Sequence, residues 1–237
     1  MKKIEIFEED KAWIEHREKF SEIYDKANYS SSLQSLVMRS SHKLIENAFD
    51  EKTFFKSVLE VGAGTGEHFP YIKHKYDHYV LTDLDPKPLE IAKSKLGSTN
   101  KDKVSFDVQP SEHLIYPDNV FDRVIATHVL EHIYYPHLAI KEWCRVLKNG
   151  GTLSILIPTD PGIAWRLGRR LGARKNAISH GIAYDYVMAR EHVNACNNLV
   201  AILSHYFPSH KESWWPFKIA SIDLNLFFAF HTTISKN

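Results

Sequence analysis

Residues 58–69 read VLEVGAGTGEHF, an apolar run that ends in three glycines at alternate positions. This pattern predicts a buried strand followed by a tight turn, with the N-terminus of the next helix behind it. Glycines let the backbone amides of such a turn approach a ligand closely. A dinucleotide fingerprint would place a third glycine three residues after Gly64, where this chain has Glu67. The turn therefore predicts a ligand site and argues against a nicotinamide dinucleotide.

Short apolar runs recur on the C-terminal side of this turn. They are HYVLT (78–82), KVSF (103–106), FDRVIA (121–126) and GTLSILI (151–157). Amphipathic stretches separate them, and two of these, 86–96 and 136–147, open with a proline that suits a first helical turn. Nearly continuous apolar strands that alternate with helices predict an α/β fold with a parallel sheet covered on both faces.

The segments on either side of this core have a different texture. Apolar spacing predicts helices over 10–49 as an N-terminal cover, and a further helix over about 191–206. Residues 159–190 show no clear period and are interpreted as an insertion that caps the site. KESWWPF (211–217) and DLNLFFAFHTT (223–233) predict two final strands, with Leu224 and Leu226 buried. The expected division is a cover over 1–50 and a main domain over 51–237.

Bulk composition limits the classes of partner. The 30 Lys and Arg against 29 Asp and Glu leave a net charge of +1, so the chain as a whole attracts neither nucleic acid nor an anionic membrane. Any electrostatic preference must be local. Cys144 and Cys196 lack metal-ribbon or disulfide spacing, which fits a reduced compartment. Since the N-terminus has no signal-peptide pattern, we expect a cytoplasmic protein.

One short motif suggests different chemistry. His128, Glu131 and His132 form HxxEH, the pattern of inverted zinc peptidases. A peptidase needs a third metal ligand, and neither Glu191 nor Glu212 stands in a context that singles it out. We therefore expect no metal.

An acidic residue follows the second predicted strand. Asp83 comes 17 residues after Gly66, where a carboxylate at the tip of the neighbouring strand can bind both hydroxyls of a ribose. The alternative is that Asp83 or Asp85 caps the helix that begins at Pro86. We assign Asp83 to the ribose and Asp85 to the cap.

Four motifs together resemble the class I S-adenosylmethionine-dependent methyltransferases, in the branch that acts on small molecules. They are VLEVGAGTG (58–66), TDLDPKPLEIA (82–92), LIYPDNVFDRVIATHVLEHI (114–133) and RVLKNGGTLSILIP (145–158). They occur in the family's order and spacing over roughly 57–158. The resemblance implies a doubly wound, Rossmann-like sheet of seven strands whose last strand is antiparallel. It also makes LEHI part of a common family phrase, so that His128 completes HxxEH by coincidence.

The resemblance assigns roles for S-adenosylmethionine to individual residues. The glycine turn would cradle the methionine part, Glu60 would meet its amino group, Leu84 would pack on adenine, and Thr127 would lie near the sulfonium. The residues of the turn are Gly62, Ala63, Gly64 and Gly66. Relatives often hold adenine with an aspartate at a position that is Pro110 here. Ser111 and Glu112, through their backbone, or Gln109 would replace it.

The resemblance places the methyl acceptor between the N-terminal helices and the insertion. A general base helps a hydroxyl acceptor, whereas an anion or a neutral amine can react without one. His128 and His132 are the candidates for such a base, with His180 and His192 as further ones. The alternative for His132 is that it only pins its helix to the sheet. Arginines suit an anionic group. The candidate substrate residues are Arg166, Arg169, Arg170, Arg174, His180 and Tyr184. Tyr24, Tyr29 and Arg39 are expected to close over the cofactor.

Three of these arginines, Arg166, Arg170 and Arg174, recur every four residues, which predicts one face of one helix. A solvated basic helix is the alternative for this cluster. The predicted function is methyl transfer to an oxygen or nitrogen of a small, anionic or phosphorylated metabolite. The competing functions are a nucleic-acid methyltransferase, a binding module without catalysis and, least favoured, a zinc peptidase.

Overall fold

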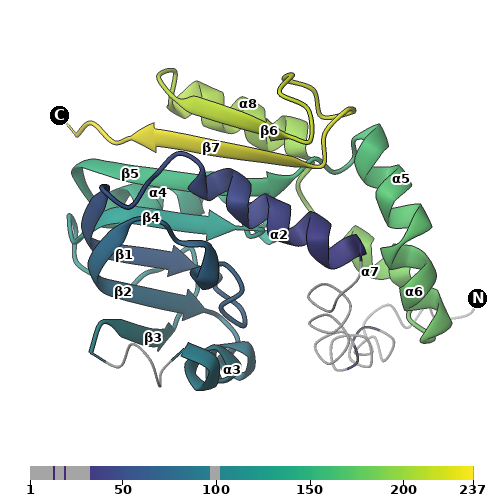
Figure 1. Ribbon diagram of the computed structural model, residues 1–237, viewed down its shortest axis with the longest axis horizontal. Coiled ribbons are helices and arrows are strands. Elements are labelled where there is room, and N and C mark those ends of the chain that lie inside the picture. The colour runs from purple at the N-terminus through teal and green to yellow at the C-terminus, as the bar shows by residue number, and fades with distance from the viewer. Residues whose placement is uncertain (1–12, 14–18, 20–32, 97–101, 237) are drawn as a thin grey trace, which may run out of the picture.

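The chain folds around one seven-stranded sheet, with strand order β3-β2-β1-β4-β5-β7-β6 (Figure 1). The computed structural model describes Trp13, Lys19 and residues 33–96 and 102–236. The strands are β1 (Phe54–Val61), β2 (Lys75–Asp83), β3 (Val104–Val108), β4 (Phe121–Thr127), β5 (Leu147–Pro158), β6 (Lys211–Trp215) and β7 (Phe227–Thr233). The first five are parallel, and β7 runs antiparallel to both β5 and β6. The predicted fold class, an α/β sheet of seven strands with an antiparallel last strand, is confirmed.

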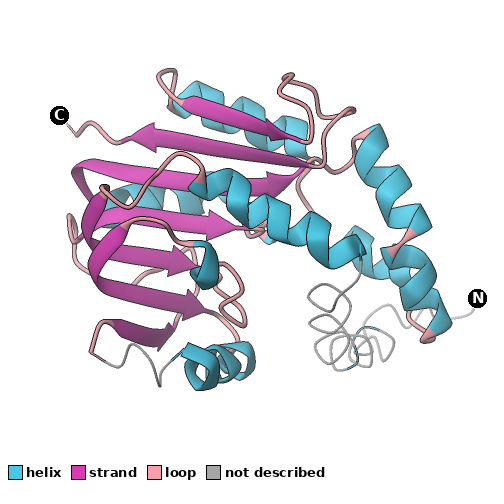
Figure 2. Ribbon diagram, viewed as in Figure 1, coloured by secondary structure: helices cyan, strands magenta, loops and turns pink. Residues whose placement is uncertain are grey.

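Helices lie on both faces of this sheet (Figure 2). The described α-helices are α2 (Leu33–Glu46), α3 (Pro86–Leu96), α4 (Pro136–Val146), α5 (Ile163–Leu171), α6 (Ala173–Ser179), α7 (Tyr184–Glu191) and α8 (Cys196–Tyr206). On one face, α4 and α8 bury Trp143 and Leu203 against the sheet. On the other face, α2 and α3 bury Ile45 and Leu89. None of the described helices is long and apolar enough to cross a bilayer.

A buried ion pair fastens α2 to the sheet. Arg123 of β4 and Glu46 of α2 are both fully buried, and the guanidinium donates to the carboxylate over 2.7 Å. His68 lies 3.2 Å from the same carboxylate. Burial alone would raise the pKa of Glu46, but Arg123 and His68 hold it well below its usual range. The pair fixes the C-terminal end of α2 near the start of β4, and Ser41, farther up the helix, contacts His128 just after the end of the same strand.

The insertion is more regular than its sequence suggested. The segment interpreted as lacking a period contains α5, α6 and α7, and α6 and α7 share a small apolar cluster of their own. Two further predictions also differ from the structure. Helix α8 begins at Cys196 rather than near residue 191. Leu224, which was expected to be buried, is 49% exposed. Leu224 precedes β7, so the pairing that buries Phe227 does not extend to it.

Candidate cofactor and methyl-acceptor site

The glycine turn after β1 contains two glycines that are needed for different reasons. Gly62 has φ +65°, and a Cβ there would lie 2.5 Å from Val129. Gly64 has φ +52°, and no atom of the chain would lie within 4 Å of its Cβ. Gly62 thus admits the loop after β4, whereas Gly64 leaves free space beside the backbone for a ligand.

The expected helix behind this turn is absent from the structure. Between β1 and β2 there is only the 3-10 turn η1 (Phe69–Tyr71), with Pro70 inside it. A proline so soon after the turn removes an amide donor that an α-helix would need. Any ligand held here therefore depends on single amides and side chains rather than on the positive end of a helix.

Glu60 lies at the end of β1, with 1% of its surface exposed. Its Oε2 accepts a 2.6 Å hydrogen bond from the Tyr79 hydroxyl, but Oε1 has no partner among the described residues. Burial raises the pKa of the Glu60 carboxyl, and the Tyr79 bond only partly opposes this. An unpartnered buried acceptor costs about 1–3 kcal/mol, so a ligand ammonium would supply the missing donor.

Asp83 connects the neighbouring strand end to the glycine turn. Its carboxylate accepts hydrogen bonds from the amides of Gly64 (2.8 Å) and Asp85 (3.0 Å). Burial raises the pKa of Asp83 despite these two donors. Asp85 accepts from the amide of Lys87 at the start of α3, as the cap assignment predicted. Leu84 is 70% exposed, and its apolar surface remains open to an aromatic ring.

The loop after β3 uses up one of the side chains considered for adenine. The Gln109 amide accepts from the backbone of Ile115 (3.0 Å) and donates to the Tyr116 hydroxyl (2.7 Å). Both ends of the side chain thus hold the loop together, which assigns Gln109 a structural role in this loop. The alternative at the backbone of Ser111 and Glu112 remains a prediction.

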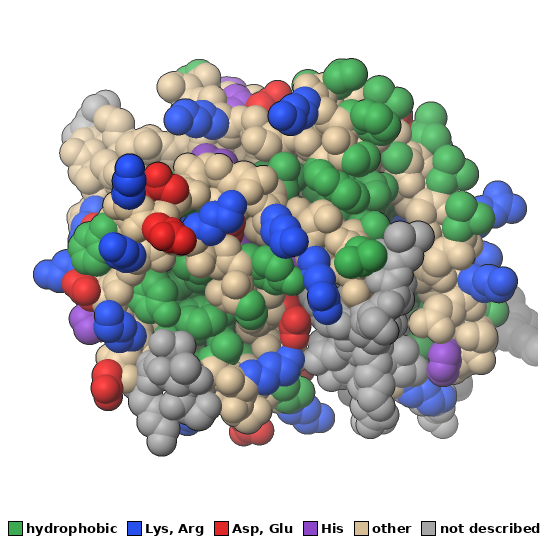
Figure 3. Space-filling view, viewed as in Figure 1, with side chains coloured by type: hydrophobic (Ala, Val, Ile, Leu, Met, Phe, Trp, Pro, Cys, Tyr) green, Lys and Arg blue, Asp and Glu red, His purple; other side chains and the backbone are tan. Residues whose placement is uncertain are grey.

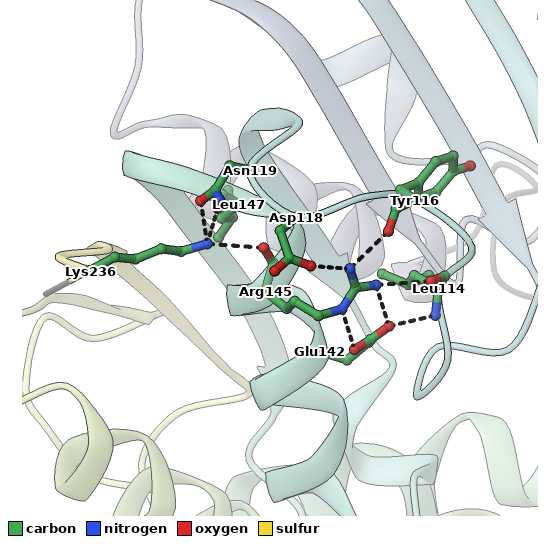
Figure 4. A network of polar contacts seen from close by, with 8 residues as sticks. All are labelled: Leu114, Tyr116, Asp118, Asn119, Glu142, Arg145, Leu147 and Lys236. Atoms are coloured by element: carbon green, nitrogen blue, oxygen red, sulfur yellow. Dashed lines mark hydrogen bonds and ion pairs between the residues drawn. The ribbon is translucent and has the colours of Figure 1, made fainter.

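That loop is held in place by α4. Arg145 donates to the carbonyls of Leu114 and Tyr116 and to Asp118, and it also pairs with Glu142 (Figure 4). Nearby, Trp143 donates to the Ser111 carbonyl over 2.9 Å, and the Ser111 hydroxyl donates to Glu112. The position of the predicted adenine contact is therefore fixed by long-range side-chain bonds.

The HxxEH motif does not have the geometry of a zinc peptidase. His128 has φ +58°, which no α-helix accommodates, and only Leu130–His132 form a 3-10 turn, η2. The two histidines are therefore not a pair four residues apart on one helix. Within residues 33–96 and 102–236, no cluster of three His, Cys, Asp or Glu is suited to a metal ion. The motif thus gives the peptidase alternative no support.

His128 lies at the end of β4, next to the buried Thr127, and contacts α2. Its Nε2 is 3.0 Å from the Ser41 hydroxyl, and its Nδ1 is 3.7 Å from Oε1 of Glu131. The ring also meets His42 and Phe227 edge-on. Burial would raise the pKa of Glu131, but His128 and His132 outweigh it and lower this pKa. The imidazole is thus held between a hydroxyl and a carboxylate.

His132 belongs to a second group of polar residues. Its Nδ1 is 2.8 Å from the Glu191 carbonyl and 3.3 Å from the Glu191 carboxylate. Burial lowers the pKa of His132, but the bond to Glu191 and the charge of Glu131 outweigh this and raise it. A raised pKa keeps the imidazole protonated to higher pH, which disfavours His132 as a proton acceptor.

The predicted substrate arginines line one cavity of about 400 Å³, although they do not share one helix. The helix breaks at Gly172, so Arg166 and Arg170 lie on α5 while Arg174 lies on α6. The one-helix prediction is therefore wrong. The cavity is lined by Asp160, Arg166, Arg169, Arg170, Arg174 and Asp185.

Acidic neighbours neutralise two of the four arginines. Arg169 pairs with Asp160 over 2.9 Å, and Arg174 pairs with Asp185 over 2.7 Å. Arg166 and Arg170 have no acidic partner among the described residues. Tyr184 is buried against Arg169, and its hydroxyl accepts from that guanidinium. His180 is exposed and bonds to the Asn176 carbonyl of its own helix, so the structure does not bring it to the cavity lining.

Sequence reasoning missed Asp160. Besides Arg169, its carboxylate accepts from His192 Nδ1 over 2.9 Å, and the His192 ring meets His132 edge-on at 5.1 Å. Burial would raise the pKa of Asp160, but His192 and Arg169 outweigh it and lower this pKa. Its position three residues after the predicted strand 151–157, at the edge where ligands bind in α/β sheets, was the available signal. Tyr24 and Tyr29 lie outside the described residues.

Comparisons with known proteins agree with this geometry. Residues 59–155 match the family model described as a methyltransferase domain. The chain is 33% identical over 103 residues to ajmaline N-methyltransferase of Rauvolfia serpentina, covering 43% of this chain and 35% of that protein. It is 27% identical over 162 residues to a ubiquinone/menaquinone biosynthesis C-methyltransferase of Francisella tularensis, covering 63% of each. The chain thus spans between about a third and two thirds of these relatives.

Solved structures share the fold at low identity. A methyltransferase from Thermotoga maritima, described as a possible histamine N-methyltransferase, superposes with a TM-score of 0.61 at 19% identity, covering 92% of this chain and 98% of its own. A methyltransferase from Methanococcus maripaludis reaches 0.61 at 14% identity, covering 92% and 94%. The matched segment carries the glycine turn, Asp83 and the end of β4, within a sheet of the predicted topology. Residues 59–155 therefore form a methyltransferase domain, and the chain shares the fold of S-adenosylmethionine-dependent methyltransferases of known structure.

Proposed function

We propose that this protein transfers a methyl group from S-adenosylmethionine to an oxygen or nitrogen of a small molecule that carries an anionic group. The observation that carries the proposal is the convergence of three features at adjacent strand ends. These are the open space at Gly64, the unpartnered Oε1 of Glu60 and the carboxylate of Asp83. The two relatives named above are methyltransferases by name, which agrees with such a reaction.

The strand-end residues fit the chemical groups of this cofactor. An ammonium suits Glu60, a ribose suits Asp83, and an apolar ring suits the exposed Leu84. Bound there, S-adenosylmethionine would supply a methyl group on a positively charged sulfur. The sulfur leaves readily because it becomes a neutral thioether when the methyl group is transferred. The protein then has to hold the acceptor close and in line, and to take up a proton where the acceptor loses one.

His128 is the proposed proton acceptor. Its two ring nitrogens face Ser41 and Glu131, so that a hydroxyl and a carboxylate hold the ring in place just after the end of β4. His132, with its raised pKa, is assigned to holding Glu191 and the insertion against η2. The sequence-based candidates for catalysis thereby receive different roles.

The arginine cavity supports an anionic acceptor. Arg166 and Arg170 keep uncompensated charge, and guanidinium groups bind carboxylate or phosphate through two parallel hydrogen bonds. Asp160 lines this cavity and also accepts a hydrogen bond from His192, so its carboxylate connects the arginine cavity to His192 and His132. An acceptor with its anion in the cavity would extend from there toward the strand ends.

Calorimetry with S-adenosylhomocysteine tests the cofactor site. We expect the wild type to bind, Asp83→Asn to lose most of the affinity, and the matched control Asp85→Asn, at the cap of α3, to keep it. Urea unfolding of each variant separates lost binding from lost fold. Absence of binding by the folded wild type would refute the proposal.

Transfer of a labelled methyl group to fractionated metabolites tests the acceptor. We expect label in the fraction retained by an anion exchanger. Arg166→Gln/Arg170→Gln should raise KM for that acceptor while kcat stays close to that of the wild type, and Lys175→Gln serves as the control. Label confined to neutral metabolites would contradict the proposed anionic acceptor. Label in nucleic acid would show that the substrate is a nucleic acid rather than a small molecule. Cofactor binding without any methyl transfer would indicate a binding module without catalysis.

A further inference from the structure

Helix α5 carries an exposed apolar row that the proposed reaction does not use. Ile163, Leu167 and Leu171 recur every four residues and therefore lie along one side of the helix. They are 51%, 54% and 79% exposed. Apolar side chains at this spacing normally face a core. We call these three residues the α5 apolar row.

The opposite side of α5 is the one that faces the protein. Trp165 packs edge-on against Phe227 and stacks near His192, and Arg169 turns toward Asp160. The helix is thus fixed by its inner side, and the α5 apolar row points away from the domain.

The row continues into the loop between β6 and β7. The carboxylate and carbonyl of Asp223 in that loop accept from the amides of Ile163 and Ala164, which places the loop against the start of α5. Its own exposed apolar side chains are Phe217 (53%), Ile219 (60%) and Leu224 (49%). Figure 3 shows hydrophobic side chains gathered over α5 and this loop, with basic side chains at the border of the patch. Contiguous apolar surface of this kind usually marks an interaction site.

Basic side chains flank the apolar row directly. Arg166 and Arg170 are exposed, lie beside the row on the helix, and have no acidic partner among the described residues. An apolar stripe bordered by uncompensated arginines is the arrangement of helices that lie in the plane of an anionic lipid surface. There the row would enter the acyl boundary while the guanidinium groups remain at the depth of the lipid phosphates.

We propose that α5 and the loop between β6 and β7 dock the protein on an anionic membrane surface. Self-association explains the face less well, because a two-fold contact would bring the same arginines of two copies together. The expectation of no membrane partner rested on the net charge of +1, whereas the docking charge is local to one helix. This proposal does not depend on methyl transfer, since docking needs neither cofactor nor acceptor.

Co-sedimentation of the full chain with vesicles tests the proposal. We expect binding to vesicles of phosphatidylcholine mixed with phosphatidylglycerol and much weaker binding to phosphatidylcholine alone. Leu167→Ser/Leu171→Ser should weaken binding at least about tenfold. Arg166→Gln/Arg170→Gln should weaken it about fivefold per residue, with the difference fading at high salt. Leu138→Ser on α4, where the leucine is 48% exposed, is the matched control and should bind normally.

The serine variants separate docking from substrate binding, since neither leucine lines the arginine cavity. Their affinity for S-adenosylhomocysteine should equal that of the wild type, which also verifies the fold. Failure of the wild type to bind the mixed vesicles, or equal binding by Leu167→Ser/Leu171→Ser, would overturn the proposal. So would a wild-type dimer in solution that becomes a monomer in this double variant, because the face would then be a self-interface.

Discussion

Removal of the buried guanidinium of Arg123 is the sharpest test of how the fold holds the site together. In Arg123→Met the apolar side chain fills much of the same space, but Glu46 keeps its charge in a position with no solvent exposure. Removing one partner of such a pair costs about 3–5 kcal/mol, because the other charge stays buried and uncompensated. Against a typical total stability of about 5–15 kcal/mol, this is a large fraction.

A double-mutant cycle separates the ion pair from packing. Glu46→Gln/Arg123→Met removes both charges and should recover most of the loss. Lys95→Met, which breaks an exposed pair with Glu67, should cost no more than about 1 kcal/mol. Urea unfolding followed by tryptophan fluorescence measures all of these. A loss below about 1 kcal/mol in Arg123→Met, or a double variant weaker than both single variants, would show that the buried charges are not coupled as described.

Other predictions concern pH, the glycine turn and the histidines. The pKa values of the buried His74 and His231 are lowered to about 4 and about 3, so the unfolded chain binds protons first as pH falls. The stability that these two neutral imidazoles provide is fully present above about pH 6.5. As the pH falls from 7 to 5, each histidine should lower the free energy of unfolding by about 2 kcal/mol. His231→Gln should reduce the loss of unfolding free energy between pH 7 and pH 5 by about 2 kcal/mol in urea titrations, and an unchanged pH dependence would contradict the assignment. Gly64→Ala should weaken S-adenosylhomocysteine binding in calorimetry at a small cost in melting temperature, while Gly62→Ala, which meets Val129, should lower the melting temperature more. With a hydroxyl acceptor, His128→Ala should lower kcat about 10²-fold or more and His132→Ala much less; the reverse order in rate assays would exchange their roles.

Much of the fold was predictable because its signals are local. The helix α3 begins at the predicted proline and ends at the predicted leucine, since Asp85 and Pro86 mark its start within the sequence itself. The glycine turn and Asp83 were found in the same way, from spacing along one βαβ unit. By contrast, the helix expected after Gly66 is only a 3-10 turn, and Pro70 was the signal against it.

The periodicity of the insertion was hidden by its glycines. Gly168 and Gly172 lower helix propensity, yet α5 forms with Trp165 packed, partly buried, against the core, and α6 forms with Ala177 buried in the cluster that it shares with α7. Tertiary contacts therefore decide whether these segments are helical, because their helix propensity alone does not. The same contacts decide which arginines are neutralised, since the partner of Arg169 is Asp160 and that of Arg174 is Asp185.

The sequence by itself thus determined the α/β class, the alternation of strands and helices over 57–158 and the residues of the cofactor turn, because each depends on neighbours within a few tens of positions. Only the tertiary structure decided which distant groups meet. Ser41 and His128 are 87 residues apart, Arg123 and Glu46 are 77 apart, and His192 and Asp160 are 32 apart. No local pattern pairs such residues. Their proximity follows from α2 and the insertion packing over the sheet and its strand ends, where burial makes each unpaired polar group costly.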